Sequence, residues 1–191
     1  MRRSYAIFAS ALLAGITFAA SANAVIIIDP STRKPITVHG HSHYTPIPRE
    51  TVQAPAGYAP GTIVVNTDER RLYLIQDNGT ALKYGIGVGR DGFQWSGVHH
   101  VTAKREWPDW RPPEQMLKRR PELPRFMAGG PTNPLGARAM YIGSTMFRIH
   151  GSNEPQTIGQ AVSSGCFRMT NDDVVDLYDR VKVGAKVVVL R

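Results

Sequence analysis

The segments Phe147-Arg148-Ile149-His150-Gly151-Ser152-Asn153 and Ser163-Ser164-Gly165-Cys166-Phe167-Arg168-Met169 indicate both the fold and the chemistry of this chain. Cys166 is the only cysteine among 191 residues, which rules out an intrachain disulfide and a metal site built on several thiolates. A lone cysteine is either a small buried hydrophobe or a reactive thiol. Because His150 and Arg168 supply a base and a positive charge nearby, the residues favour a catalytic Cys166.

The glycine before the cysteine also fits nucleophilic catalysis. A residue without a side chain at Gly165 lets a substrate carbonyl approach closely, and the N–H groups of Gly165 and Cys166 are candidates to hold an oxyanion. Ser163 belongs to the same loop. From the residues alone, a core histidine remains the alternative for His150.

Short apolar runs surround these motifs and predict a mainly β domain. Strands are expected at 62–66, 71–75, 81–88, 98–105, 140–142, 146–149 and 186–190, with a hairpin turn at Asp77-Asn78-Gly79. One amphipathic helix is expected after Thr170, which can cap it together with Asp173, and this helix ends by Gly184. The predicted fold class is therefore a mainly β domain with a few peripheral short helices.

Two loop segments carry further signals. Residues 107–136 are rich in proline, glycine and charge, with one or two helical turns at 114–120, and a segment of this kind is typical of a functional lid. Gly87-x-Gly89-x-x-Gly92 matches a dinucleotide-binding fingerprint on paper, but no helix is expected after it, so the match is interpreted as accidental.

The N-terminus predicts export. Residues 1–24 combine a basic start, an apolar run and the small residues Ala22-Asn23-Ala24, which is the order of a secretory signal peptide cleaved after Ala24. Residues 25–58 are proline-rich and are expected to form an extended arm or linker before a catalytic domain at 59–191. His39, His41 and His43 alternate as strand residues on one face would, but their loop-like surroundings favour an incidental cluster over a metal site.

Composition narrows the class of partner. The hydrophobic fraction of 42% and the charged fraction of 20% exclude a disordered chain and a multi-span membrane protein. A net charge of +8 favours anionic partners. For an exported protein without basic runs interleaved with aromatics, an anionic envelope polymer is expected rather than a nucleic acid.

The motifs, taken in order, resemble the L,D-transpeptidase catalytic domain, also called the YkuD-like domain. The resemblance includes His150-Gly151-Ser152-Asn153, Ile158-Gly159 and Ser163-x-Gly165-Cys166-x-Arg168-Met169. It extends to Ile63-Val64-Val65-Asn66, Leu72-Tyr73-Leu74, Gly87-Val88-Gly89-Arg90, Trp107-Pro108-x-Trp110-x-Pro112-Pro113 and Asn133-Pro134-Leu135-Gly136-x-Arg138, and so covers about 58–191.

This resemblance implies a β-sandwich-like fold and a periplasmic, monomeric cell-wall enzyme that needs neither metal nor cofactor. By the family pattern, Cys166 attacks the peptide bond after the third residue of a peptidoglycan stem tetrapeptide, D-alanine leaves, and the acyl group passes to an amine of another stem, a D-amino acid or an envelope protein. His150 is then the general base, and the Gly151 carbonyl orients its ring. Two roles are open for Arg168: it binds a substrate carboxylate or it braces the loop.

One position departs from the family pattern, and one rival activity stays open. Many members carry histidine where this chain has Ser164. Either this position is not essential for proton transfer or the activity of this chain is reduced, and the first is favoured because His150 already supplies a base. The alternative function is a thiol hydrolase that trims peptidoglycan stems or releases wall-attached proteins. A non-catalytic wall-binding module is disfavoured because it would lack the Cys/His pair.

Overall fold

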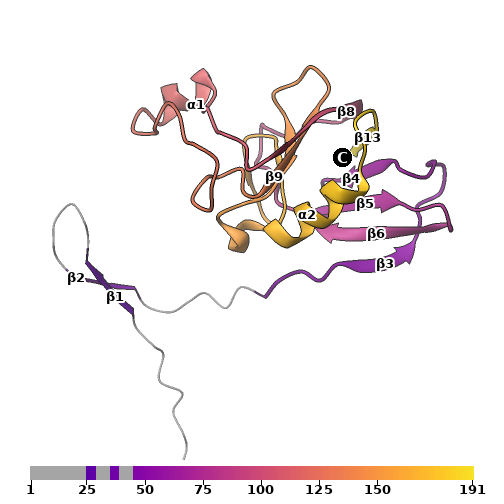
Figure 1. Ribbon diagram of the computed structural model, residues 1–191, viewed down its shortest axis with the longest axis horizontal. Coiled ribbons are helices and arrows are strands. Elements are labelled where there is room, and N and C mark those ends of the chain that lie inside the picture. The colour runs from indigo at the N-terminus through magenta and orange to yellow at the C-terminus, as the bar shows by residue number, and fades with distance from the viewer. Residues whose placement is uncertain (1–24, 29–34, 39–44) are drawn as a thin grey trace, which may run out of the picture. The chain divides into compact units, whose positions relative to one another are not determined.

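The computed structural model describes residues 25–28, 35–38 and 45–191 (Figure 1). The expected signal peptide and the His39/His41/His43 cluster lie outside the described residues. Within the expected arm, β1 (Val25–Ile28) and β2 (Pro35–Val38) pair as an antiparallel two-stranded ribbon. The ribbon falls in one unit (Met1–His43), and the sheet, helices and pocket described below all lie in a second, Tyr44–Arg191.

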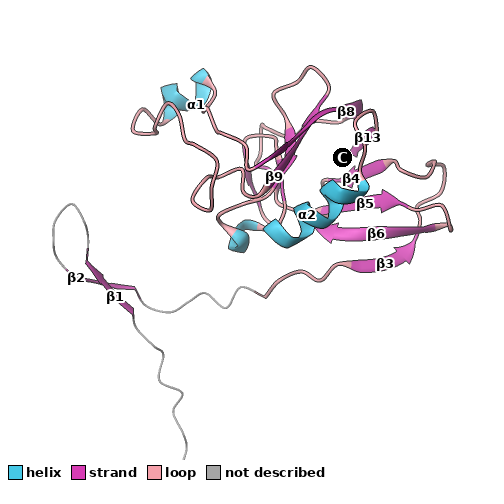
Figure 2. Cartoon of the chain, viewed as in Figure 1, coloured by secondary structure: helices cyan, strands magenta, loops and turns pink. Residues whose placement is uncertain are grey.

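A nine-stranded sheet forms the second unit, in the order β12-β10-β9-β8-β13-β4-β5-β6-β3. Its members are β3 (Glu50–Gln53), β4 (Ile63–Asn66), β5 (Arg71–Ile75), β6 (Thr80–Gly85), β8 (Gly97–Glu106), β9 (Arg138–Ile142), β10 (Arg148–His150), β12 (Phe167–Arg168) and β13 (Lys186–Leu190). A small second sheet pairs β7 (Val88–Gly89) with β11 (Ala161–Ser163). The expected mainly β fold with few helices is confirmed (Figure 2).

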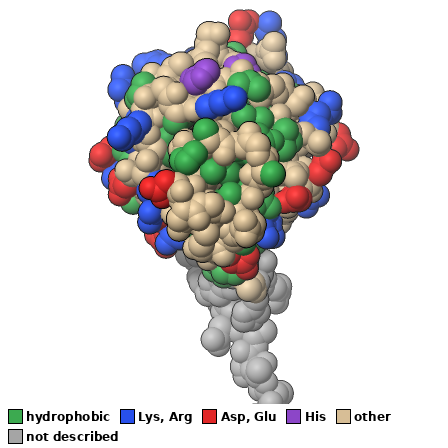
Figure 3. Space-filling model, turned by 90° about the vertical axis from the view of Figure 1, so that its right-hand side faces the viewer, with side chains coloured by type: hydrophobic (Ala, Val, Ile, Leu, Met, Phe, Trp, Pro, Cys, Tyr) green, Lys and Arg blue, Asp and Glu red, His purple; other side chains and the backbone are tan. Residues whose placement is uncertain are grey.

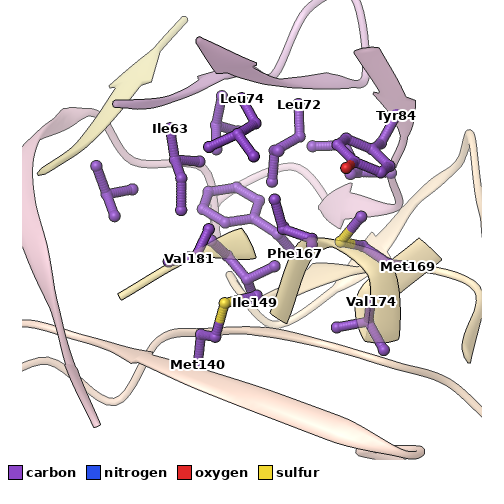
Figure 4. Close-up of a cluster of buried hydrophobic side chains, with 14 of the residues drawn as sticks. Ile63, Leu72, Leu74, Tyr84, Met140, Ile149, Phe167, Met169, Val174 and Val181 are labelled. Atoms are coloured by element: carbon purple, nitrogen blue, oxygen red, sulfur yellow. The ribbon is translucent and has the colours of Figure 1, made fainter. Parts of the chain in front are cut away.

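Strand β8 joins the two halves of the large sheet. Its first residues pair with β13, its last residues pair with β9, and the register shifts between Val101 and Ala103. A bulge of this kind bends a strand and increases its twist, so one strand can serve both halves of a sandwich-like fold. The halves enclose one core, drawn in Figure 4, in which Ile63, Leu72 and Tyr84 from one half meet Ile149 and Phe167 from the other.

Helix α2 (Asn171–Arg180) packs beside β9 and contributes Val174 and Leu177 to the core. It begins where the sequence predicts, because the Thr170 hydroxyl accepts a hydrogen bond from the Asp173 N–H at 3.1 Å. The other helices are short: α1 (Glu114–Arg119), inside the segment expected to be a lid, and a 3-10 turn η1 (Pro155–Thr157).

Two sequence expectations differ from the structure. The strand expected at 81–88 breaks after Gly85, because Val88 and Gly89 leave the hairpin to pair with β11. The compact unit also begins earlier than residue 59. Antiparallel pairing with β6 incorporates Glu50–Gln53 into the sheet, and Arg49 forms an ion pair with Asp176 of α2 at 2.6 Å.

Candidate active site

Strands β10 and β12 bring the two candidate catalytic residues together. They run parallel, with Ile149 opposite Phe167 and His150 opposite Arg168, and the Met169 N–H donates to the His150 carbonyl at 2.8 Å. Adjacent strands lie about 4.8 Å apart, so Cys166, one residue before Phe167, lies beside the strand that carries His150. Both residues line one pocket of about 680 Å³. The thiol's hydrogen-bond partner is the Met146 carbonyl, at 4.0 Å, and not the imidazole.

The imidazole of His150 is held in one tautomer. Its side chain is buried, and Nδ1 lies 2.6 Å from the Gly151 carbonyl oxygen, as the sequence predicts. Because a carbonyl can only accept, Nδ1 carries the proton and Nε2 keeps its lone pair. The pKa of His150 is lowered to about 3, chiefly by burial; the Gly151 hydrogen bond opposes this shift, and the positive charges of Arg168 and Arg148 add to it. The ring is therefore neutral at neutral pH.

Cys166 is also neutral in the resting site. Burial raises the pKa of its thiol, whereas the Arg148 backbone amide and the charges of Arg148 and Arg168 lower it. The sequence predicts that Arg168 would favour the thiolate, and its charge does act in that direction. Desolvation is the larger effect, however, so the net pKa of the thiol is raised and the neutral thiol is favoured over the thiolate.

Aromatic packing fixes the loop that carries the thiol. Gly165 has φ +106°, and a Cβ at this position would collide with the ring of Phe147. Phe147 stacks on Trp95 with ring centroids 4.6 Å apart, and the Trp95 Nε1–H donates to the Gly165 carbonyl at 2.8 Å. Close approach of Phe147 is therefore a structural reason for this glycine, in addition to the expected close approach of a substrate.

The hydroxyl of Ser163 changes the expected oxyanion site. It accepts from the Gly165 N–H at 3.1 Å and donates to the Cys166 carbonyl at 2.6 Å. The Gly165 N–H is thus occupied inside the loop, contrary to the expectation that it would face an oxyanion. The Cys166 N–H donates to no acceptor within the described part of the chain, and it remains the backbone candidate.

Arg168 braces the pocket wall. Its Nη1 donates to a Glu154 carboxylate oxygen at 3.0 Å and lies 3.4 Å from the Thr157 hydroxyl oxygen. Of the two roles left open by the sequence, the structure favours bracing, because the guanidinium is already paired with a carboxylate.

The segment 107–136 forms the opposite wall of the pocket, where a lid was expected. The pocket is lined on this side by residues that include Trp110, Met116 and Arg119. Buried Asn133 holds the segment's end: its Nδ2 donates to the carbonyls of Met127 and Ala128, and its Oδ1 accepts from the Leu135 N–H at 2.9 Å.

Neither metal binding nor a membrane span has support in the described residues. No group of three or more His, Cys, Asp or Glu side chains within 45–191 is placed to hold a metal ion. Among the described helices, none combines the length and apolar character needed to cross a membrane.

Sequence reasoning missed three residues that shape this site. Arg148 lines the pocket and lowers the Cys166 pKa, and its buried Nε finds no partner among the described residues. Alternation along a strand would have placed it on the same face as His150. Trp95 belongs to no motif, and Arg90 ends the motif Gly87-Val88-Gly89-Arg90 without any signal that it would lie at the Cys166 loop. Only the three-dimensional fold brings the two residues there.

Comparison with known proteins shows the family to which a chain with this fold and these site residues belongs. The family model described as the L,D-transpeptidase catalytic domain (YkuD) matches residues 60–189. The chain belongs to this family. A probable L,D-transpeptidase of Escherichia coli, ErfK/SrfK, is 41% identical over 137 residues, which are 67% of this chain and 43% of that protein. The chain thus spans less than half the length of this relative.

Solved structures agree on the fold. An L,D-transpeptidase from Mycobacterium smegmatis aligns with 68% of this chain and 58% of its own at a TM-score of 0.55 and 19% identity. A Brucella melitensis protein described as a probable carnitine operon oxidoreductase is 47% identical, with a TM-score of 0.52 over 78% of this chain and 97% of its own. In the present chain, a turn and not a helix follows β7, so Gly87-x-Gly89-x-x-Gly92 lacks the context of a dinucleotide site.

The first prediction concerns Gly165. Gly165→Ala should cost more stability than Gly184→Ala, because both positions have positive φ but only Gly165 faces a ring, and Gly184 has open space. The backbone strain common to both is about 1–3 kcal/mol. Denaturant unfolding measures the difference, and Gly165→Ala should also change the alkylation rate of Cys166. Equal unfolding free energies for the two variants would contradict the role of Phe147.

The second prediction concerns acid stability. Because the folded pKa of His150 is about 3, below its ordinary value of 6.5, the unfolded chain binds more protons between these pH values. Stability should therefore fall as pH falls through that window. The decline should be shallower in His150→Gln than in wild type, and unchanged in the control His100→Gln, whose side chain is exposed. Parallel pH profiles for wild type and His150→Gln would refute the buried neutral imidazole.

Proposed function

We propose that this chain is an exported enzyme that remodels peptidoglycan by cysteine acyl transfer. The observation that carries the proposal is that the thiol of Cys166 and the buried imidazole of His150, whose Nδ1 is hydrogen-bonded to the Gly151 carbonyl and whose Nε2 therefore keeps its lone pair, line one pocket of about 680 Å³. Membership of the L,D-transpeptidase family supports a peptidoglycan stem tetrapeptide as acyl donor. The basic, apolar and small-residue order of 1–24 supports a periplasmic location.

The first half-reaction follows from these groups. The Cys166 Sγ–H gives its proton to His150 Nε2 as sulfur attacks the carbonyl carbon after the third residue of the donor, forming the S–C bond. Negative charge on the carbonyl oxygen is met by the Cys166 N–H. The C–N bond then breaks, His150 returns the proton to the leaving amine, and D-alanine departs from a thioester.

The second half-reaction reverses the proton path. An acceptor amine attacks the thioester carbonyl and gives a proton to His150 Nε2, the S–C bond breaks, and the sulfur recovers the proton. The Gly151 carbonyl keeps the imidazole in the required tautomer throughout, because it accepts from Nδ1. The acceptor is a stem amine, a free D-amino acid or an envelope protein, whereas water at the same step would make the chain a thiol hydrolase.

A single assay separates these outcomes. Purified protein incubated with tetrapeptide stems should yield cross-linked dimers and free D-alanine by mass spectrometry, and Cys166→Ala should lose turnover entirely while keeping its fold. Removing one small, half-buried side chain costs little packing, and circular dichroism confirms the fold.

The control is Ser144→Ala, an exposed turn substitution that should retain full activity. Tripeptides without dimers would favour the hydrolase. Near-normal turnover by Cys166→Ala would overturn the proposed function.

A further inference from the structure

The pocket around Cys166 carries an excess of positive charge. Its lining contains one carboxylate, that of Glu154, and the arginines Arg90, Arg119, Arg120, Arg148 and Arg168. Arg168 is paired with Glu154, and Arg120 is paired with Glu122. On the molecular face drawn in Figure 3, by contrast, acidic and basic side chains are interspersed. The pocket therefore has more positive charge than its own carboxylate balances.

Two of these arginines share one aromatic ring. The guanidinium carbon of Arg90 lies 4.2 Å from the centroid of Phe93, and that of Arg119 lies 5.1 Å from it. Arg90 follows β7, and Arg119 ends α1 in the opposite wall. Neither is ion-paired with any carboxylate in the described part of the chain. Attraction to the ring holds both cations close, and their mutual repulsion favours an anion between them.

Ser164 fixes Arg90 next to the nucleophile. The Arg90 Nη1–H donates to the Ser164 hydroxyl oxygen at 3.3 Å, two residues before Cys166. The backbone supports the same placement, because the Arg90 N–H donates to the Ser163 carbonyl at 3.1 Å. A neutral hydroxyl can accept this hydrogen bond, whereas a protonated imidazole at position 164 would repel the guanidinium.

We propose that Arg90 and Arg119 form a subsite for a free carboxylate of the acyl-donor peptide, and that Ser164 is its positioning residue. A guanidinium offers paired N–H donors that match a carboxylate, and two of them can grip both of its oxygens. Naming the ligand as a donor peptide rests on the proposed function, whereas the anion subsite itself does not. This carboxylate is either the C-terminal one of the donor peptide or an internal one on a side chain.

The first experiment measures the subsite without any turnover. Iodoacetate is an anion and iodoacetamide is neutral, and both alkylate the same thiol. The rate of alkylation of Cys166 by iodoacetate divided by the rate by iodoacetamide, each followed by intact mass, therefore reports an anion site beside the thiol. The ratio should fall about tenfold in the Arg90→Gln/Arg119→Gln double variant, the effect of losing about 1.4 kcal/mol of anion binding. The matched control is Arg125→Gln, an exposed arginine of the same segment that does not line the pocket.

Positioning by Ser164 is tested with the same ratio. Ser164→Ala should lower the ratio of the iodoacetate rate to the iodoacetamide rate, while the iodoacetamide rate itself stays at the wild-type value. Ser164→Thr keeps the hydroxyl and should have the wild-type ratio. An unchanged ratio in the double variant overturns the anion subsite. A Ser164→Ala ratio equal to wild type overturns the role of the hydroxyl.

The second experiment identifies the carboxylate. Donor tetrapeptides are compared with versions amidated either at the C-terminus or at an internal carboxylate. Amidation of the carboxylate that binds the subsite should lower kcat/KM of the wild type about tenfold. The same amidation should have no further effect in the double variant. The position whose amidation behaves in this way is the carboxylate that the subsite binds. Equal losses in wild type and double variant contradict the proposal. Absence of turnover with every peptide contradicts the proposed function and the peptide ligand with it, while the alkylation ratio still decides the anion subsite.

Discussion

The parallel pairing of β10 with β12 is the interaction on which the candidate site depends. Ile149 and Phe167 lie opposite each other in this pair, and both side chains are fully buried in the core. Because successive residues of a strand face opposite sides, their burial fixes which way the neighbouring residues His150 and Arg168 point. A one-residue slip would move Phe167 out of the core, so the hydrophobic core itself specifies the register that places Cys166 beside His150.

Burial also determines the resting charge of the site. It lowers the pKa of His150 and raises that of Cys166, and both shifts favour neutral forms. The charges of Arg148 and Arg168 favour a thiolate but oppose an imidazolium, so their two effects oppose each other when a proton moves from the thiol to His150. In the proposed reaction, negative charge would therefore develop on the sulfur and on the carbonyl oxygen during attack, because the resting thiol carries none.

The sequence predicts the mainly β fold, the capped helix after Thr170 and the Gly151–His150 contact, because each depends on local pattern or on neighbours in the chain. It does not predict the break after Gly85, the occupied Gly165 N–H or the net charge of the thiol. Those depend on the partner strand of Val88, on the conformation of the Ser163 side chain and on desolvation. Trp95 and Arg90 are more than 60 residues from Cys166 in the chain, so no local pattern reveals that they contact its loop, although Arg90 itself lies in a sequence motif.

The central claim is that His150 is a neutral base with its proton on Nδ1. Nitrogen NMR of the imidazole ring tests this most directly, because the shifts of Nδ1 and Nε2 distinguish the tautomers and the cation. The account predicts a protonated Nδ1 and an unprotonated Nε2 that do not change between pH 8 and pH 5. A proton on Nε2, or titration to the cation near the ordinary pKa of 6.5, would contradict it.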